Sequence, residues 1–197
     1  MNFEVLGIVK VRNTENIEDC IKTLEKYCTE IIIIGEDDEY SSYGKLDLIP
    51  FDLINPDWII SVFSDEIISP RFNYMARTLM ANEFINSWDA HILHFWNMYE
   101  YRADKLWDSF DVSFLWRFMP EIDYKWKGEE IVPHNQPGPE KHSSVFLFNR
   151  RFDDKLKRAQ EFKEFFKDEP EYNAITQLHY HSLVNTDGMI LERWTDG

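Results

Sequence analysis

The chain has 197 residues, of which 44% are hydrophobic and 16% aromatic, and its formal net charge is −15. A chain of this length and apolar content can bury one core well, so we expect a single domain over residues 1–197. The acidic balance excludes broad nucleic-acid binding, because a phosphate backbone would be repelled. No apolar run is long enough to span a bilayer and no signal peptide is evident, so we expect a cytoplasmic protein without a membrane span.

The first part of the chain alternates strand, helix and strand. Residues 3–11 (FEVLGIVKV) are apolar and β-branched, which predicts a strand. From Asn16, the expected N-cap, apolar side chains recur on one helical face, and residues 30–34 (EIIII) then predict a second buried strand. These elements indicate a βαβ unit and a parallel sheet. Cys20 and Cys28 lie along this helix and its end, a geometry that does not suit a disulfide.

A third strand leads directly into two adjacent acids. Residues 57–62 (DWIISV) predict a strand that is buried on both faces, and Asp65 and Glu66 follow it closely. Ligands gather at the carboxyl ends of strands in open α/β sheets, so this edge is our candidate site. The same acids also stand before a predicted helix, where an acid pair is favourable for structural reasons alone. The acidic loop at residues 35–43 is either a second part of the site or a solvated turn.

The remaining segments have the patterns of a short strand, a helix, two strands, an irregular proline-rich loop and a second helix. In chain order they are residues 46–51, 69–82, 90–101, 112–118, 123–139 and 153–166. We expect Ser69 to cap the first of these helices, with Pro70 in its first turn, and the two strands to pair antiparallel. The tail from Tyr172 is expected to be partly mobile.

The sequence contains no serine-hydrolase elbow, no P-loop and no zinc-ligand spacing. Its segments, taken in order, instead resemble the family 2 glycosyltransferases, particularly small bacterial and phage members. The matching segments are VKVRNTEN (9–16), EIIII with the acidic loop after it (30–43), DWIISVFSDEI (57–67), YRAD (101–104), LWRF (115–118) and EKHSS (140–144).

The resemblance implies a GT-A-like, Rossmann-related α/β fold. In such a fold a mostly parallel central sheet is flanked by helices and continues into an antiparallel C-terminal part. Residues 1–66 would form the nucleotide-binding half, and residues 67–197 the acceptor half with a C-terminal helix. The implied activity is transfer of a sugar from a nucleotide-diphosphate sugar to the hydroxyl of a glycan or other acceptor, as in polysaccharide biosynthesis. Mn²⁺ or Mg²⁺ usually assists this reaction, and the aromatic content leaves room for an oligomer.

The same resemblance implies roles for individual residues. The nucleotide would be bound by Val11, Arg12, Asn13, Glu36, Asp37, Ser64 and Asp65. The metal would be bound by Asp65, Glu66 and His142, since hard cations prefer carboxylate oxygens. An inverting reaction needs a general base, for which Asp104 and Asp111 are the first candidates.

One departure from the family pattern supports an alternative function. Relatives have Asp-x-Asp-Glu where this chain has Phe63-Ser64-Asp65-Glu66, so the first acid is missing. The alternative is a catalytically inactive glycosyltransferase-like module with a binding or structural role.

Several aromatic and histidine side chains have two interpretations. Tryptophans can stack on sugar faces, but in so aromatic a chain most are expected in the core. The ones concerned are Trp88, Trp96, Trp107, Trp116 and Trp126. His142 is either a metal ligand or simply exposed. His179 and His181 lack a third ligand nearby, so we expect a structural or surface role for them.

Overall fold

The computed structural model describes residues 3–11, 16–34, 55–95, 99–103, 111–119, 123–127, 130–134, 140–150 and 189–195. One compact unit comprises Met1–Ile92 and Phe110–Asn149, and a second comprises Leu93–Ser109 and Arg150–Gly197. Within these described ranges, no helix is long and apolar enough to cross a bilayer.

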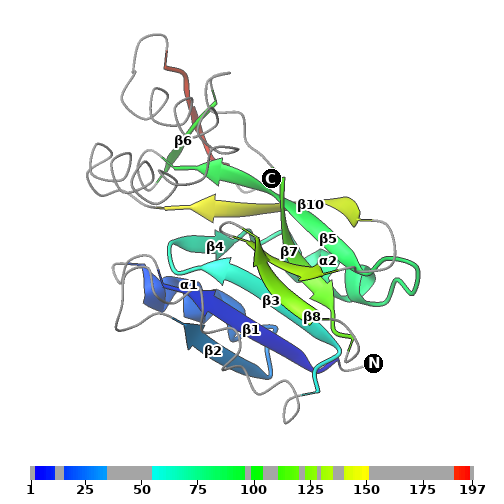
Figure 1. The fold of residues 1–197 in the computed structure, drawn as a ribbon. Helices are drawn as coiled ribbons and strands as arrows, with labels where there is room; N and C mark the ends of the chain where they lie inside the picture. Colours follow the sequence, from blue (N-terminus) through cyan, green and yellow to red (C-terminus); the bar gives the residue numbers. More distant parts are fainter. Residues whose placement is uncertain are drawn as a thin grey trace. The chain divides into compact units, whose positions relative to one another are not determined.

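A seven-stranded sheet dominates the first unit, in the order β2-β1-β3-β7-β5-β10-β4 (Figure 1). Its strands are β1 (Val5–Lys10), β2 (Glu30–Ile34), β3 (Trp58–Phe63), β4 (Glu66–Ile68), β5 (Ser87–His94), β7 (Asp111–Arg117) and β10 (Glu140–Asn149). β1 is parallel to both β2 and β3. β7 is antiparallel to β3 and β5, and β10 is antiparallel to β4. The fold is therefore α/β with a mixed sheet, in which the parallel pairing that we expected for most of the sheet joins β2, β1 and β3.

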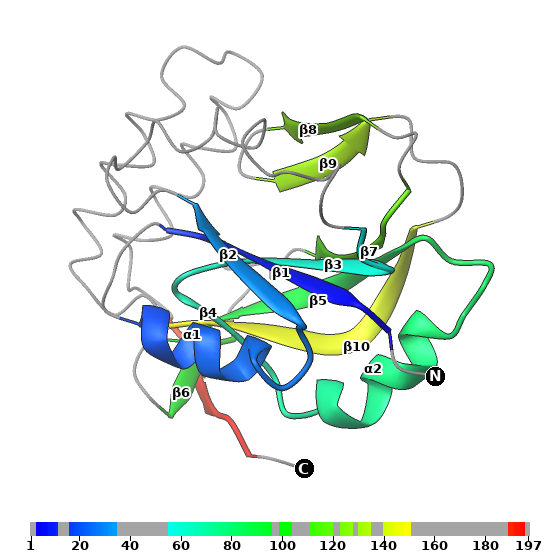
Figure 2. The ribbon, with the colours of Figure 1, turned by 90° about the horizontal axis from the view of Figure 1, so that it is seen from below.

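Two helices pack on the same face of this sheet (Figure 2). They are α1 (Ile17–Leu24) and α2 (Phe72–Met80), and both form where the apolar spacing predicts them. Each buries its apolar stripe in one cluster that also contains Val5, Val9 and Trp58. Tyr27, in the turn after α1, packs against Phe72 of α2, and their rings lie edge to face with centroids 4.7 Å apart.

The opposite face of the parallel strands carries a smaller apolar cluster of Leu6, Ile8, Ile34, Ile59 and Trp116. Because successive residues of a strand point to opposite faces, β1 and β3 divide their side chains between the two clusters. This explains why both strands are mostly apolar rather than alternating, and why the sequence predicts them as buried on both sides.

The link between β3 and β4 requires the sheet to curl. The two strands are consecutive along the chain but are separated in the sheet by β7, β5 and β10. In a flat sheet this separation would be roughly 19 Å, or four strand spacings. Only Ser64 and Asp65 connect Phe63 to Glu66, and three Cα steps span at most about 11 Å. The sheet therefore bends until β4 lies close to the end of β3, and Figure 2 shows this bend in β10.

Two local predictions were wrong in detail. β2 is the edge strand of the sheet, and only Ile34 in it is buried, so it is not the buried strand we expected. Arg71, not Ser69, is the N-cap of α2. Ser69 instead accepts the Phe146 N–H of β10 through its hydroxyl at 3.1 Å. Asn16 does stand at the N-cap of α1, without a side-chain bond to that helix.

The predicted irregular loop at residues 123–139 contains a hairpin. β8 (Asp123–Lys127) and β9 (Glu130–His134) pair antiparallel, with Pro133 opposite Tyr124. A two-stranded ribbon consists of two edge strands, and edge positions tolerate a proline. The prolines therefore did not exclude a strand here.

The segment at residues 90–101 was predicted as one strand but contributes to two. β5 ends at His94, and β6 (Glu100–Arg102) is a separate strand that pairs antiparallel with β11 (Leu191–Arg193) in the second unit. The antiparallel pairing of β5 with β7 confirms the expected partner. The predicted strand at 46–51 and the helix at 153–166 lie outside the described residues.

Candidate functional site

The carboxyl ends of the parallel strands meet at one edge of the sheet. Lys10, the last residue of β1, is the register partner of Ile34 on β2 and of Phe63 on β3. Just beyond the strands, the Val11 N–H donates to the Ile34 carbonyl and the Ser64 N–H donates to the Lys10 carbonyl, both at 2.9 Å. Two predicted nucleotide-binding residues, Val11 and Ser64, are thereby held close together.

Asp65 is the most unusual residue at this edge. It is 0% exposed, and neither of its carboxylate oxygens has a hydrogen-bond partner within the described residues. Burying a polar group without a partner typically costs on the order of 1–3 kcal/mol, and a charged group costs more. A native fold tolerates this cost where a ligand or ion compensates it, which makes Asp65 the strongest site candidate on structural grounds.

Glu66 has a structural role in the same turn. Its Oε2 accepts the backbone N–H of Phe63 at 2.9 Å, so the carboxylate closes the turn from β3 to β4. The side chain is buried, with 3% exposure. The alternative that Asp65 and Glu66 are helix N-terminal acids is wrong, because Glu66 is the first residue of β4 and α2 begins only at Phe72.

Cys20 brings helix α1 against the acid turn. Its thiol donates to the Phe63 carbonyl at 3.4 Å. Burial raises the pKa of this thiol, and the nearby charges of Glu66 and Asp65 raise it further. The protonated thiol is therefore the form present beside the two carboxylates. Cys20 and Cys28 are both free, which confirms the prediction that they do not form a disulfide.

Lys10 lies at the same strand ends, although it was not among the predicted site residues. Its side chain is only 7% exposed, and its ammonium lies 3.8 Å from the centroid of the Phe63 ring. In the sequence, Lys10 is a single basic residue near the end of the run that predicts the first strand.

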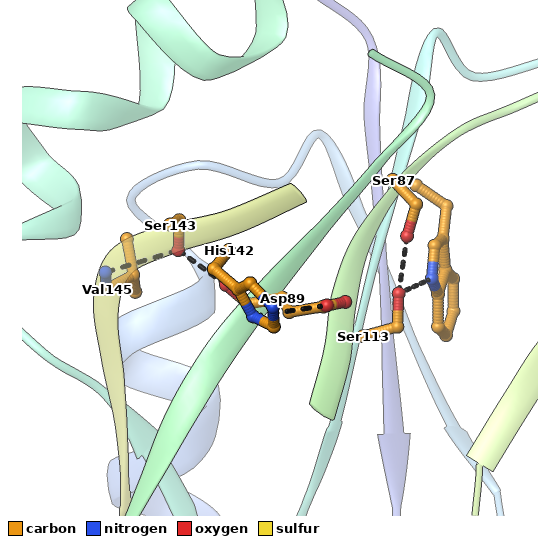
Figure 3. A network of polar contacts seen from close by, with 7 residues as sticks. Ser87, Asp89, Ser113, His142, Ser143 and Val145 are labelled. Carbon is orange, nitrogen blue, oxygen red and sulfur yellow. Dashed lines mark hydrogen bonds and ion pairs between the residues drawn. The ribbon is translucent and has the colours of Figure 1, made fainter. Parts of the chain in front are cut away.

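His142 lies in β10 and pairs with Asp89 of β5 (Figure 3). Its Nδ1 is 3.6 Å from Asp89 Oδ2, and the histidine side chain is 74% exposed. Next to it, the Ser143 hydroxyl donates to the Asp89 carbonyl at 2.7 Å. This contact ties β10 to β5 beside the ion pair.

The structure does not bring His142 to Asp65 and Glu66. The register partner of Glu66 on β10 is Asn149. His142 lies seven positions earlier on the same strand, which corresponds to roughly 20 Å of extended chain. Among the residues that the structure describes, no group of three or more His, Cys, Asp or Glu side chains could hold a metal ion. Asn149, which is 2% exposed, is therefore the β10 residue beside Glu66.

The other predicted site residues are described incompletely or not at all. Asp111 is the first residue of β7, opposite His91 of β5, and its side chain is outside the described part. The rest lie outside the described residues: Arg12, Asn13, Glu36, Asp37 and Asp104. Of the YRAD segment, Tyr101 donates its hydroxyl to Glu192 at 2.6 Å, across the β6–β11 pair.

Two tryptophans belong to the core rather than to a sugar-binding surface. Trp116 is 1% exposed and donates its indole N–H to the Ser113 hydroxyl, which also bonds to Ser87 (Figure 3). Trp88 is 8% exposed and donates to the Leu79 carbonyl. Trp96, Trp107, the Trp126 side chain, His179 and His181 are outside the described part of the chain.

Comparison with known proteins gives no family assignment. No protein-family model matches this sequence, and no curated protein is significantly similar to it.

Proposed function

We propose that this protein is a glycosyltransferase of the GT-A type, which transfers a sugar from a nucleotide-diphosphate sugar to an acceptor hydroxyl. The proposal rests on the sequence resemblance and on one structural observation. A buried carboxylate without a hydrogen-bond partner in the described part, that of Asp65, directly follows a parallel strand at the edge where β1, β2 and β3 end. Ligands of α/β proteins bind outside the carboxyl ends of such strands.

The transfer reaction requires particular chemical groups at the carboxyl ends of these strands. The acceptor oxygen attacks the anomeric carbon while the bond from that carbon to the diphosphate oxygen breaks. The diphosphate leaves with the bonding electron pair, and a general base takes the proton of the acceptor. We propose Asp104 or Asp111 as this base, as the resemblance implies. Charge accumulates on the leaving diphosphate, which therefore needs positive charge or hydrogen-bond donors close by.

A divalent cation is one source of that charge, and Asp65 fits as one of its ligands. Both oxygens of Asp65 lack a hydrogen-bond donor among the described residues, whereas one oxygen of Glu66 is used by the Phe63 N–H. Mg²⁺ is commonly bound by one or two carboxylates together with substrate phosphates. When bound, Mn²⁺ or Mg²⁺ would stabilise the charge of the leaving diphosphate.

The second candidate is a glycosyltransferase-like module without catalytic activity. Phe63 in place of the first acid favours it, and so does the pairing of His142 with Asp89 on another strand. The two candidates differ in turnover. An active enzyme cleaves the sugar donor and releases the nucleoside diphosphate. The inactive module would bind the donor but leave it intact.

The test is nucleotide-dependent thermal stabilisation, measured with UDP, GDP and their sugar conjugates, with and without Mn²⁺. A ligand at ten times its Kd should raise the melting temperature of a chain of this size by about 3–6 °C. Asp65→Asn should remove the part of the shift that depends on Mn²⁺. If no nucleoside diphosphate changes the melting temperature at millimolar concentration with either metal, the proposed function is wrong.

Asp57→Asn is the matched control for Asp65→Asn. Asp57 precedes β3 at its other end, is exposed, and accepts the Glu4 N–H, which an amide oxygen can also accept. This variant carries the same chemical change at the opposite end of the same strand. It should leave the nucleotide shift intact, and a loss equal to that of Asp65→Asn would indicate a general effect of charge rather than a site.

A further inference from the structure

We propose that one face of the β6–β11 ribbon binds a neutral oligosaccharide, and that this oligosaccharide is the acceptor of the transferred sugar. The binding surface is inferred from the second unit alone, because both strands belong to it. Its role as the acceptor site rests on the proposed function.

The β6–β11 ribbon exposes aromatic side chains and buries an arginine. Register partners, and alternate residues of one strand, point to the same face of a sheet. Pairing of β6 with β11, continued by the Trp194 N–H to the Tyr99 carbonyl, therefore places four side chains on one face: Tyr99, Tyr101, Glu192 and Trp194. Tyr99 is 63% exposed and Glu192 is also exposed, whereas Arg102, on the other face, is only 4% exposed. Because aromatic side chains usually lie inward and arginines outward, this reversal marks the aromatic face as a binding surface.

The aromatic rings of this face are held in place before a ligand arrives. The Tyr101 ring packs against Trp194 on one side and Phe95 on the other, with centroids 6.4 and 6.1 Å apart. Its hydroxyl donates to the Glu192 carboxylate at 2.6 Å. A preorganised surface loses little conformational entropy on binding. Flat rings of this kind present an apolar surface to the C–H face of a sugar ring.

The polar groups of the ribbon select a neutral sugar. Glu192 and Arg193 are both exposed, and the guanidinium of Arg193 lies 5.8 Å from the centroid of the Tyr99 ring. A sugar hydroxyl both donates and accepts hydrogen bonds, so the carboxylate and the guanidinium can bind different hydroxyls of one ring. An anionic glycan or a nucleic acid would be repelled by Glu192 and by the net charge of −15.

The experiment is calorimetric titration of maltohexaose, cellohexaose and chitohexaose into the purified full chain without nucleotide. The proposal expects at least one of these neutral oligosaccharides to bind. Trp194→Ala and Tyr99→Ala should each weaken that binding by on the order of 10-fold. Tyr74→Ala is the matched control, because it removes a tyrosine that is 85% exposed on α2 in the first unit. It should leave the affinity unchanged.

Trp194→Phe guards against a loss of fold, because it keeps an aromatic ring and should retain most of the affinity. The melting temperature of each variant without ligand shows whether the fold is intact. A hyaluronan oligosaccharide and oligothymidylate serve as anionic probes and should not bind.

The outcomes separate this inference from the proposed function. If none of the neutral oligosaccharides binds at millimolar concentration, or if Trp194→Ala and Tyr99→Ala bind as well as the wild type, the acceptor surface is wrong. Binding of an anionic probe that depends on Trp194 would also overturn it. A nucleotide-dependent thermal shift would leave the proposed function standing in each of these cases. Oligosaccharide binding without any nucleotide shift would instead retain the binding surface and overturn the transferase.

Discussion

The Glu66 carboxylate accepts the backbone N–H of Phe63, three residues before it, inside a turn whose residues are all buried. Because Ser64 and Asp65 lie between these two groups, this hydrogen bond holds the segment that carries the candidate site. The position of Asp65 therefore depends on its neighbour more than on its own contacts.

Removal of the Glu66 carboxylate should destabilise the fold. In Glu66→Ala, the buried Phe63 N–H loses its acceptor, which costs about 1–3 kcal/mol of the free energy of unfolding. Glu66→Gln keeps an acceptor oxygen and should lose clearly less. Urea unfolding of the two variants measures the difference. If they are equally destabilised, the charge of Glu66 matters rather than its hydrogen bond.

Gly7 in the centre of β1 should not tolerate a methyl group. A Cβ at this position would lie 3.0 Å from Cys28 Sγ and 3.2 Å from Ile31 Cγ1. Overpacking of this kind costs about 1–3 kcal/mol, so Gly7→Ala should lower the midpoint of urea unfolding. Cys28→Ala removes the closer atom, and the double variant should recover part of the loss. If the double variant loses as much stability as Gly7→Ala and Cys28→Ala together, the predicted contact between the two side chains is wrong.

The protein should lose stability in alkaline solution. Burial raises the pKa of Cys28 from 9.0 to about 12 and that of Tyr27 from 10.0 to about 12. Above about pH 9 the unfolded chain therefore releases protons that the folded protein still holds, so the unfolded state binds fewer protons and the free energy of unfolding decreases with pH. Between pH 9 and 12 this decrease should be smaller in Cys28→Ala. Chemical unfolding at several pH values measures both slopes, and a stability that rises across this range would contradict the assignment.

His142 should be dispensable for both the fold and metal binding. Its contact with Asp89 at 3.6 Å is made by a side chain that is 74% exposed, and contacts at the solvent-exposed surface contribute little to stability. His142→Ala should change the free energy of unfolding by less than about 0.5 kcal/mol. It should also leave any Mn²⁺-dependent thermal shift unchanged, in contrast to Asp65→Asn. Loss of that shift in His142→Ala would show that the histidine reaches the site after all.

The sequence predicted the elements whose signals are local. The helical spacing around Cys20 and Leu24 predicted α1, and the uninterrupted apolar runs predicted β1 and β3, because periodicity reports directly which faces are buried. β10 was missed because EKHSS was interpreted from the family resemblance alone, although Val145 and Leu147 alternate after it as in a strand. For the β8–β9 hairpin, Gly128 between two segments of strand-forming residues favours a turn. The prolines nearby led us to predict an irregular loop instead.

The candidate site was predicted in part, for a physical reason. That Val11, Ser64 and Asp65 would share an edge follows from parallel strands, whose carboxyl ends must meet. The partners of Lys10 and His142 depend on strand order and register, which are set by pairings between distant segments. Nothing in the local sequence of β10 specifies that His142 lies beside β5 rather than beside the acid turn.

The curl of the sheet also has a kinetic consequence. β4 is joined to β3 by two residues, but it pairs with β10, and the paired residues Ile68 and Leu147 are roughly 80 positions apart in the sequence. Contacts between such distant segments form slowly, because the entropy of closing a long loop must be lost first. During synthesis the acid turn would leave the ribosome long before the strand that secures β4. The candidate site would therefore be among the last parts of the protein to reach its final geometry.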